Sequence, residues 1–219
     1  MRLSILFILV TFPVTIFAKA PAGYYSSLEG KCGAELKEAV RWAVGSLQSL
    51  TYGDDTWNAF KTTDVRIVNG EECWWDMYSN NNIPINIDHY DMVLAHGVHS
   101  SWWGGENNGA YRDLYNLNPA DRDANNRKSI YPLGIVSQQT WSNGVATVGH
   151  PILGSGGGSN MVFEPADEYK GDFARAYMYL FTVYKGLMWE YDDSDRNYMF
   201  VDNALSLRPW AQDLLLERA

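Results

Sequence analysis

Apolar residues recur at helical spacing in the N-terminal part of the chain. Residues 34–50 carry an apolar side chain every three or four positions, which predicts an amphipathic helix with one buried stripe. A second, shorter helix is expected after Asp54, with Trp57 and Phe60 turned inward. The stripe of the first helix consists of Leu36, Val40, Ala43, Leu47 and Leu50.

Helical spacing returns in the C-terminal third. Residues 171–188 have a stripe rich in aromatic side chains, which is most simply a core-facing stripe. A last helix is expected to start near Ser206 and Pro209. The two stripes contain Phe173, Tyr177, Leu180, Phe181, Tyr184 and Met188, followed by Trp210, Leu214 and Leu215.

Short apolar runs predict strands in the middle of the chain. Cys73–Ser79 and Met92–Val98 are interpreted as buried strands, and Gln138–Gly149 as a hairpin whose turn residues Asn143 and Gly144 have positive φ. The glycine run of residues 154–160 leads into a strand-like segment. A phosphate-binding loop would open onto a helix, so this run is interpreted as a flexible loop.

A helix with clear boundaries is expected between the second strand and the hairpin. Asn118 is a good N-cap, Pro119 suits the first helical position, and Tyr131-Pro132 ends the run. No linker separates two cores. The fold class is therefore α+β, a mostly helical single domain with small antiparallel sheets.

The N-terminus has the pattern of a secretory signal peptide. Residues 1–18 contain one early cation, Arg2, then an apolar run broken by Pro13 and ending at Ala18. The mature protein is expected to be secreted or periplasmic, without a membrane anchor once the signal is removed, and monomeric. An oxidising compartment permits a bridge between Cys32 and Cys73, and two free buried thiols are the alternative.

Charge limits the classes of partner. The formal net charge is -9 at pH 7, which repels nucleic acid and acidic polysaccharide. A polyanionic substrate therefore requires a local cationic patch or a metal ion. The cations of the central segment are Arg112, Arg122, Arg127 and Lys128, and acidic residues at 113, 121 and 123 lie among them.

The central segment contains groups suited to phosphodiester hydrolysis. This reaction needs a base that deprotonates water near neutral pH and a cation that offsets charge on the phosphoryl oxygens. His96, at the end of a strand, supplies an imidazole, and Asn125, on the following helix, supplies an oxygen ligand for a hard divalent ion. A structural histidine and a solvated asparagine are the alternative interpretation.

Several motifs, in order, resemble the bacterial endonuclease I family. "AHGVHSSWWGG" and "DLYNLNPADRDANNRKSIYPLG" are similar to its central block, with "WDMYS" upstream and "VFEPADEYKGDFARAYMYL" downstream. The resemblance covers about residues 24–216, within an expected domain of residues 24–219. These are ββα-metal (His-Me finger) nucleases that cut DNA and often RNA and leave a 5′-phosphate.

The resemblance assigns roles to individual residues. His96 falls on the general base and Asn125 on the ligand of a Mg²⁺, Mn²⁺ or Ca²⁺ ion. Arg122 or Arg127 is expected to stabilise the product, and Arg175 to anchor its helix. DNA is the expected substrate, with RNA as a second.

The sequence departs from the family pattern near the proposed site. Ala95 stands where the family usually has a Glu that binds the metal, and Ile130 stands where the pattern has Asn. His99 and Ser100 also differ, and an Arg- and Asn-rich C-terminal segment is missing. The candidate substitute acids are Asp91, Glu106 and Glu164.

Three alternatives remain, of which the first follows from these departures. The first is a nuclease fold without activity that binds nucleic acid or has a structural role. The second is a carbohydrate-binding module, suggested by nine Trp. The third is a different metal site, in which His96 and His99, with His89, bind a transition metal.

Overall fold

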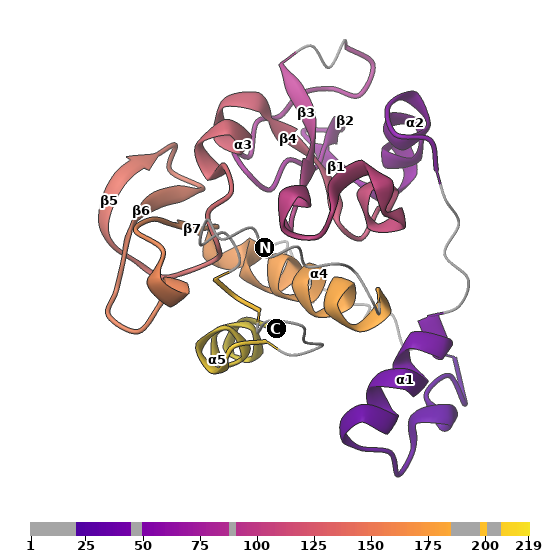
Figure 1. Ribbon diagram of the computed structural model, residues 1–219. Coiled ribbons are helices and arrows are strands. Elements are labelled where there is room, and N and C mark those ends of the chain that lie inside the picture. Colours follow the sequence, from indigo (N-terminus) through magenta and orange to yellow (C-terminus); the bar gives the residue numbers. More distant parts are fainter. Residues whose placement is uncertain (1–20, 45–49, 88–90, 185–197, 201–206) are drawn as a thin grey trace, which may run out of the picture.

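The chain forms an α+β domain with small antiparallel sheets, as expected (Figure 1). The computed structural model describes residues 21–44, 50–87, 91–184, 198–200 and 207–219. The expected signal peptide, His89 and Ser206 lie outside these ranges. Within them, the helices are α1 (Gly33–Val44), α2 (Asp54–Thr63), α3 (Arg122–Lys128), α4 (Lys170–Val183) and α5 (Pro209–Arg218).

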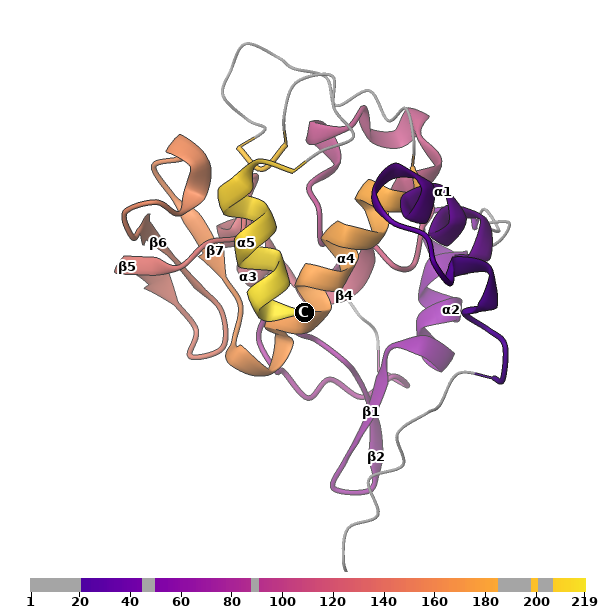
Figure 2. The same ribbon diagram turned by 90° about the horizontal axis from the view of Figure 1, so that it is seen from below.

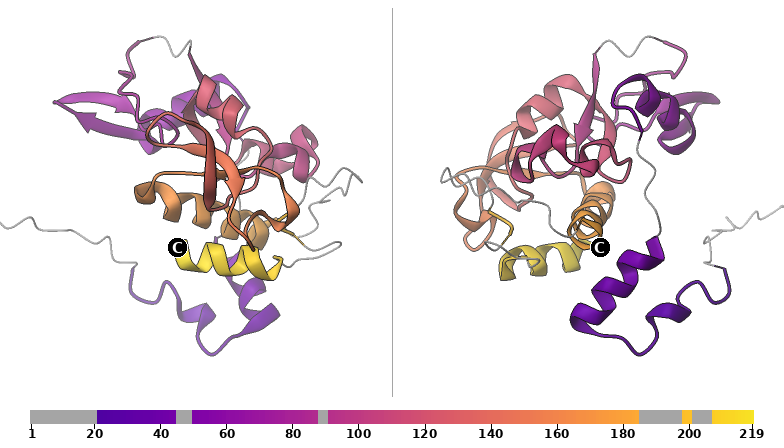
Figure 3. Two further views of the ribbon diagram at one scale, coloured as in Figure 1. Left: turned by 90° about the vertical axis from the view of Figure 1, so that its left-hand side faces the viewer. Right: turned by 45° about the vertical axis from the view of Figure 1, so that its right-hand side comes forward.

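The strands form separate sheets of two or three members, all antiparallel. One pair is β1 (Val65–Val68) with β2 (Glu71–Trp74), which projects from the body of the molecule (Figures 2 and 3). A second pair is β3 (Met92–His96) with β4 (Leu117–Asp121). The third sheet contains β5 (Val136–Ser142), β6 (Thr147–Pro151) and β7 (Val162–Glu164).

Helix α4 runs through the middle of the domain, with α5 beside it on the outer side (Figures 1 and 2). The first part of its expected stripe is buried: Phe173 is 1% exposed and Tyr177 and Leu180 are 0% exposed. Phe181 and Tyr184 are half-buried, and Met188 lies outside the described residues. Leu214 and Leu215 of α5 belong to the same core. Burying these large side chains supplies much of the driving force for folding.

The β3–β4 pair separates two hydrophobic clusters. Ala95 and Ala120 belong to the large core around α4, whereas Met92 and Leu117 belong to a smaller cluster with Trp57 and other side chains near α2. Successive side chains of a strand point to opposite faces, which explains the division. Helix α3 packs on the large-core side through Ala124.

The helix was expected to have Asn118 as its N-cap, and this was wrong: α3 begins three residues later than expected, at Arg122. Asn118 and Pro119 lie in β4, paired with Ala95 and Leu94. A proline is tolerated there because each strand of a two-stranded sheet is an edge. The actual N-cap is Asp121, whose Oδ1 accepts a hydrogen bond from the Ala124 amide at 2.8 Å.

The expected strand Cys73–Ser79 also ends early, after Trp74. Asp76 is fully buried, and its carboxylate accepts hydrogen bonds from the Tyr78, Ser79 and Asp121 amides. These bonds hold the "WDMYS" segment as a turn against the end of β4. Burial raises the pKa of the Asp76 carboxyl, and the hydrogen bonds oppose the shift.

Helix α1 is less buried than its apolar stripe predicts. Leu36, Val40 and Ala43 are only half-buried, because α1 lies at the side of the domain and contacts the end of α4 (Figures 1 and 3). The Lys37 ammonium lies 3.4 Å from the Phe181 ring centroid, and Arg41 Nε donates to the Val183 carbonyl oxygen at 3.1 Å.

The hairpin and the glycine run have the expected connections. Residues 138–149 form the β5–β6 hairpin, although only Gly144 of its turn has positive φ. The glycine run leads into β7, as expected. It is not simply a loose loop, because Gly156 is buried and Gly157 lies against Trp210 of α5.

Candidate functional site

The His96 side chain lies at the C-terminal end of β3. Its partner across the β3–β4 pair is Leu117. Three aromatic rings surround the imidazole. The Tyr52 ring is stacked on the imidazole at 6.0 Å between centroids, and the Tyr111 and Trp103 rings lie at 4.6 and 5.9 Å.

A backbone carbonyl determines which nitrogen of His96 carries the proton. His96 Nε2 lies 3.0 Å from the Tyr111 carbonyl oxygen. Because a carbonyl oxygen only accepts, Nε2 is the protonated nitrogen of the neutral ring and Nδ1 keeps a free lone pair. Among the residues that the structure describes, no side chain or backbone group forms a hydrogen bond with Nδ1.

Burial keeps this imidazole neutral. The pKa of His96 is lowered to about 4, mainly by desolvation; the hydrogen bond to Tyr111 opposes this shift, and the nearby Lys128 charge adds to it. The ring is therefore a neutral acceptor across the whole range near neutral pH. That state is the one a general base requires.

Lys128 is the α3 residue that contacts His96. Its side chain is 1% exposed, and its ammonium donates to the His96 carbonyl oxygen at 3.1 Å. No carboxylate within the described ranges forms an ion pair with it. Desolvation lowers the pKa of Lys128 to about 7. From the sequence, Lys128 was identified only as one of the cations of the central segment.

Ala95 lies in the core beside this contact. It is 1% exposed and belongs to the large hydrophobic cluster. The methyl group provides neither an oxygen ligand for a metal nor a carboxylate for Lys128. The departure from the family pattern at this position is thus accommodated by apolar packing.

The other expected site residues lie along α3. Asn125 is half-buried, while Arg122 and Arg127 are exposed. Arg122 Nη2 donates to the Met92 carbonyl oxygen at 3.4 Å. Arg127 Nε lies 3.5 Å from Asp123 Oδ1, and its guanidinium lies 6.0 Å from the Trp141 ring centroid. The structure brings α3 against β3, with Lys128 rather than Asn125 in hydrogen-bonding contact with His96.

The candidate substitute acids do not gather around His96. Glu164 accepts from the Val136 amide at 2.7 Å and forms an ion pair with Lys170 at 2.8 Å, so its role is structural. Asp91 and Glu106 are exposed. Over the parts of the chain that the structure describes, no three His, Cys, Asp or Glu side chains form a group that could hold a metal ion.

The transition-metal alternative has no support from the described histidines. His99 Nδ1 accepts from the Ser101 amide at 3.2 Å and caps a short 3₁₀ helix, whereas His96 Nε2 is bound to Tyr111. Arg175 has the expected structural role. It pairs with Asp172 at 2.6 Å and donates to the Ala219 carbonyl oxygen at 3.4 Å.

The bridge between the two cysteines is not formed. Cys32 is exposed near the start of α1 and Cys73 is buried in β2, and both are free thiols. Within the described ranges, no helix is both long and apolar enough to cross a membrane.

Two proteins named extracellular ribonuclease are similar in sequence to this chain. The chain is 26% identical over 172 residues to a protein named extracellular ribonuclease from Bacillus subtilis (strain 168). It is also 26% identical over 175 residues to a protein of the same name from Bacillus amyloliquefaciens. Each match covers 74% of this chain but only 54% of the relative. No solved structure matches the chain significantly.

The family assignment rests on a longer match. The family model described as Endonuclease I matches residues 32–217, which span β1 to β7 and all of α2 to α4. The match includes the strand that ends at His96 and the helix that carries Asn125. The chain therefore belongs to the Endonuclease I family.

Proposed function

We propose that this chain is a secreted endonuclease that hydrolyses phosphodiester bonds of DNA, with His96 as the general base. The observation that carries the proposal is the state of the His96 ring. Its Nε2 is bound to the Tyr111 carbonyl oxygen at 3.0 Å, which leaves Nδ1 as the acceptor of the ring. A neutral ring with a free Nδ1 lone pair can remove a proton from water.

The surroundings of His96 orient the ring for this role. The Tyr111 carbonyl fixes the tautomer, and the Tyr52 ring lies parallel to the imidazole at 6.0 Å between centroids. The Lys128 ammonium holds the carbonyl of His96 itself, which ties the strand end to α3. These contacts reduce the reorganisation needed when water and phosphate approach.

Asn125 is the proposed ligand of a divalent ion on α3. Its half-buried amide is a single oxygen donor, which is compatible with Mg²⁺ because this ion usually keeps several waters and binds phosphate oxygens of the substrate. Such an ion supplies positive charge to the phosphoryl oxygens. The same donor is compatible with Mn²⁺, whereas Ca²⁺ normally requires more oxygen ligands.

Arg122 and Arg127 are proposed to contact the product phosphate. Both are exposed on α3, and a guanidinium can bind two phosphate oxygens at once. Arg127 must first give up its ion pair with Asp123, which is exposed and therefore weak. The relatives named extracellular ribonuclease make RNA a second substrate to test.

A second candidate is a nuclease fold that binds nucleic acid without cutting it. The arrangement of Ala95 and Lys128 favours this alternative. The methyl group replaces an oxygen ligand, and the buried Lys128 ammonium donates to the carbonyl oxygen of the next residue, His96. Positive charge at this place would oppose the binding of a divalent ion.

Nicking of supercoiled plasmid by the chain without residues 1–18 tests both candidates. Wild type is compared with His96→Ala, Asn125→Ala and Ala95→Glu, each with Mg²⁺ and with EDTA. His150→Ala is the matched control for His96→Ala, because His150 is an exposed histidine of β6. We expect EDTA to abolish nicking, and His96→Ala to reduce it by about a hundredfold or more.

Each outcome separates the candidates. Nicking that persists unchanged in His96→Ala would contradict the proposed base. Silence of wild type with activity in Ala95→Glu would show an intact scaffold that lacks one ligand. Silence of every variant would favour the binding protein. Parallel assays with single-stranded RNA determine the substrate preference.

A further inference from the structure

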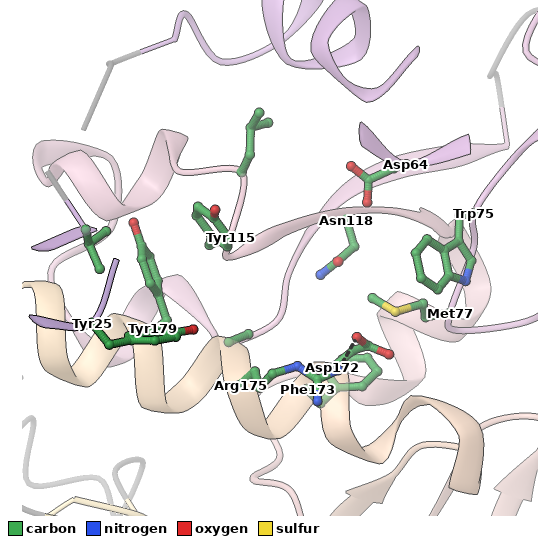
Figure 4. A pocket seen from close by; sticks show the side chains of 13 residues that line it. Tyr25, Asp64, Trp75, Met77, Tyr115, Asn118, Asp172, Phe173, Arg175 and Tyr179 are labelled. Atoms are coloured by element: carbon green, nitrogen blue, oxygen red, sulfur yellow. Dashed lines mark hydrogen bonds and ion pairs between the residues drawn. The ribbon is translucent and has the colours of Figure 1, made fainter. Parts of the chain in front are cut away.

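A cavity of about 640 Å³ lies between β4 and α4 (Figure 4). Its size falls within the roughly 300–1,000 Å³ that is usual for small-molecule sites. Asp64 and Asn118 lie on one side of it, and the side chains of α4 lie on the other (Figure 4). Its main lining residues are Asp64, Trp75, Asn118, Phe173, Arg175 and Tyr179.

Asp64 carries an uncompensated negative charge at this cavity. Its Oδ2 accepts a hydrogen bond from Thr63 Oγ1 at 2.6 Å. No Lys, Arg or His within the described residues forms an ion pair with it. Burial raises the pKa of its carboxyl to about 6, so the group remains mostly ionised at pH 7.

The opposite wall is electrically balanced. Asp172 forms an ion pair with Arg175 at 2.6 Å, and both groups line the cavity. Asp64 is thus the acid whose charge a ligand could satisfy. A carboxylate held partly out of water without a cation is a frequent mark of a binding site.

Aromatic side chains form part of the cavity lining. Trp75 follows β2, while Phe173 and Tyr179 come from α4 (Figure 4). Tyr179 is held in place because its hydroxyl donates to Asp113 Oδ2 at 2.8 Å. Such walls suit a flat, largely apolar ligand that also carries hydrogen-bond donors.

We propose that this cavity binds a guanine base, with the Asp64 carboxylate as its acceptor. Guanine presents two adjacent donors, N1–H and the 2-amino group, and a carboxylate can accept both. Adenine and cytosine place an acceptor next to their amino group on that edge, and uracil and thymine have one N–H between two carbonyls. The identification of the ligand as a nucleobase rests on the proposed function.

The cavity is distinct from the His96 site. Asn118 pairs with Ala95, and side chains of a directly opposed pair share one face. His96 is the next residue along β3 and therefore points to the other face. A guanine in the cavity would thus add a base contact away from the scissile phosphate. This contact gives a nuclease a preference for guanine near its cleavage site.

Calorimetric titration with guanosine tests the proposal without any catalysis. The full chain without residues 1–18 is titrated in EDTA with guanosine, inosine, adenosine and cytidine. Inosine is the matched ligand control, because it keeps N1–H and lacks only the 2-amino group. Asp64→Asn is nearly isosteric and replaces one acceptor with a donor. Asp55→Asn, at an exposed position of α2 outside the cavity lining, is the matched protein control.

We expect guanosine to bind more tightly than inosine, and Asp64→Asn to weaken guanosine on the order of tenfold to a hundredfold. Asp55→Asn should retain the preference for guanosine. Absence of guanosine binding by wild type, equal binding of guanosine and inosine, or an unchanged preference in Asp64→Asn would overturn the proposal. His96→Ala should bind guanosine normally, so loss of nicking and loss of base binding are distinguished.

Discussion

At the scale of single residues, the site depends on how burial shifts protonation. His96 and Lys128 are both largely removed from water, and desolvation is the first cause of the pKa shift in each. The two groups meet through the His96 carbonyl oxygen. His96, whose imidazole is neutral, and Lys128, which titrates near pH 7, are therefore joined by a direct hydrogen bond to the His96 backbone.

The depressed pKa of His96 predicts loss of stability in acid. The folded-state pKa is about 4, below the ordinary value of 6.5, so the unfolded chain binds more protons between these values. The stabilising contribution is complete above pH 6.5 and is lost as the pH falls through 4. Urea unfolding of wild type and His96→Gln at pH 7 and pH 4 measures it.

Between pH 7 and pH 4, wild type should lose on the order of 2–3 kcal/mol more of its unfolding free energy than His96→Gln. Parallel pH curves for the two proteins would show that His96 is hydrated in solution.

Lys128→Met should stabilise the protein at pH 7. The folded-state pKa of about 7 lies below the ordinary 10.5, so the unfolding free energy of wild type rises as the pH rises between these values. Methionine removes this dependence and the cost of burying the charge. It also leaves the His96 carbonyl oxygen without its donor, which offsets part of the gain.

We expect a net gain on the order of 1–3 kcal/mol at pH 7. The exposed Lys61, changed to Met, is the control. Thermal unfolding measured at pH 7 and pH 10 decides the prediction, and a lower melting temperature of Lys128→Met at pH 7 would contradict it.

At the scale of elements, close backbone approach explains the glycine run. A Cβ at Gly157 would lie 2.5 Å from the Tyr198 carbonyl oxygen and 2.6 Å from Trp210 Nε1. Gly157 also has a φ of 59°. Because glycine has no side chain, the loop before β7 can pack closely against α5. The glycine run is therefore not a free linker.

Gly157→Ala should destabilise the protein by on the order of 2–4 kcal/mol, because strain at positive φ adds to overpacking. Gly154→Ala is the matched control. Gly154 has a φ of 87°, but a Cβ there would meet nothing within 4 Å. Urea unfolding should show the smaller loss for Gly154→Ala. Equal losses would mean that α5 does not pack on this loop in solution.

At the scale of the whole molecule, the two cysteines lie in different environments. Cys32 is exposed and Cys73 is 2% exposed, and neither is bridged. A thiol reagent should therefore modify one cysteine of the native protein and both after denaturation. Mass spectrometry of native and urea-treated samples counts the modified thiols. No modification in either sample would show a bridge and contradict the structure.

Local pattern by itself determined much of this protein. The inward residues of α2, the stripe of α4, the β5–β6 hairpin and the strand that ends at His96 all follow from spacing that is visible along the chain. The family and the positions of His96 and Asn125 follow from ordered motifs. These features are local, since each depends on residues only a few positions apart.

Only the tertiary structure decided how these parts are used. Pro119 entered a strand because β3 offered it an edge, against its local preference for a helix start. The tautomer of His96 depends on the carbonyl of Tyr111, and the burial of Lys128 depends on packing of α3 against β3. Such contacts join distant parts of the chain, and burial sets the free energy of each charge. The spacing of residues along the sequence shows neither which distant residues meet nor how deeply a charged group is buried.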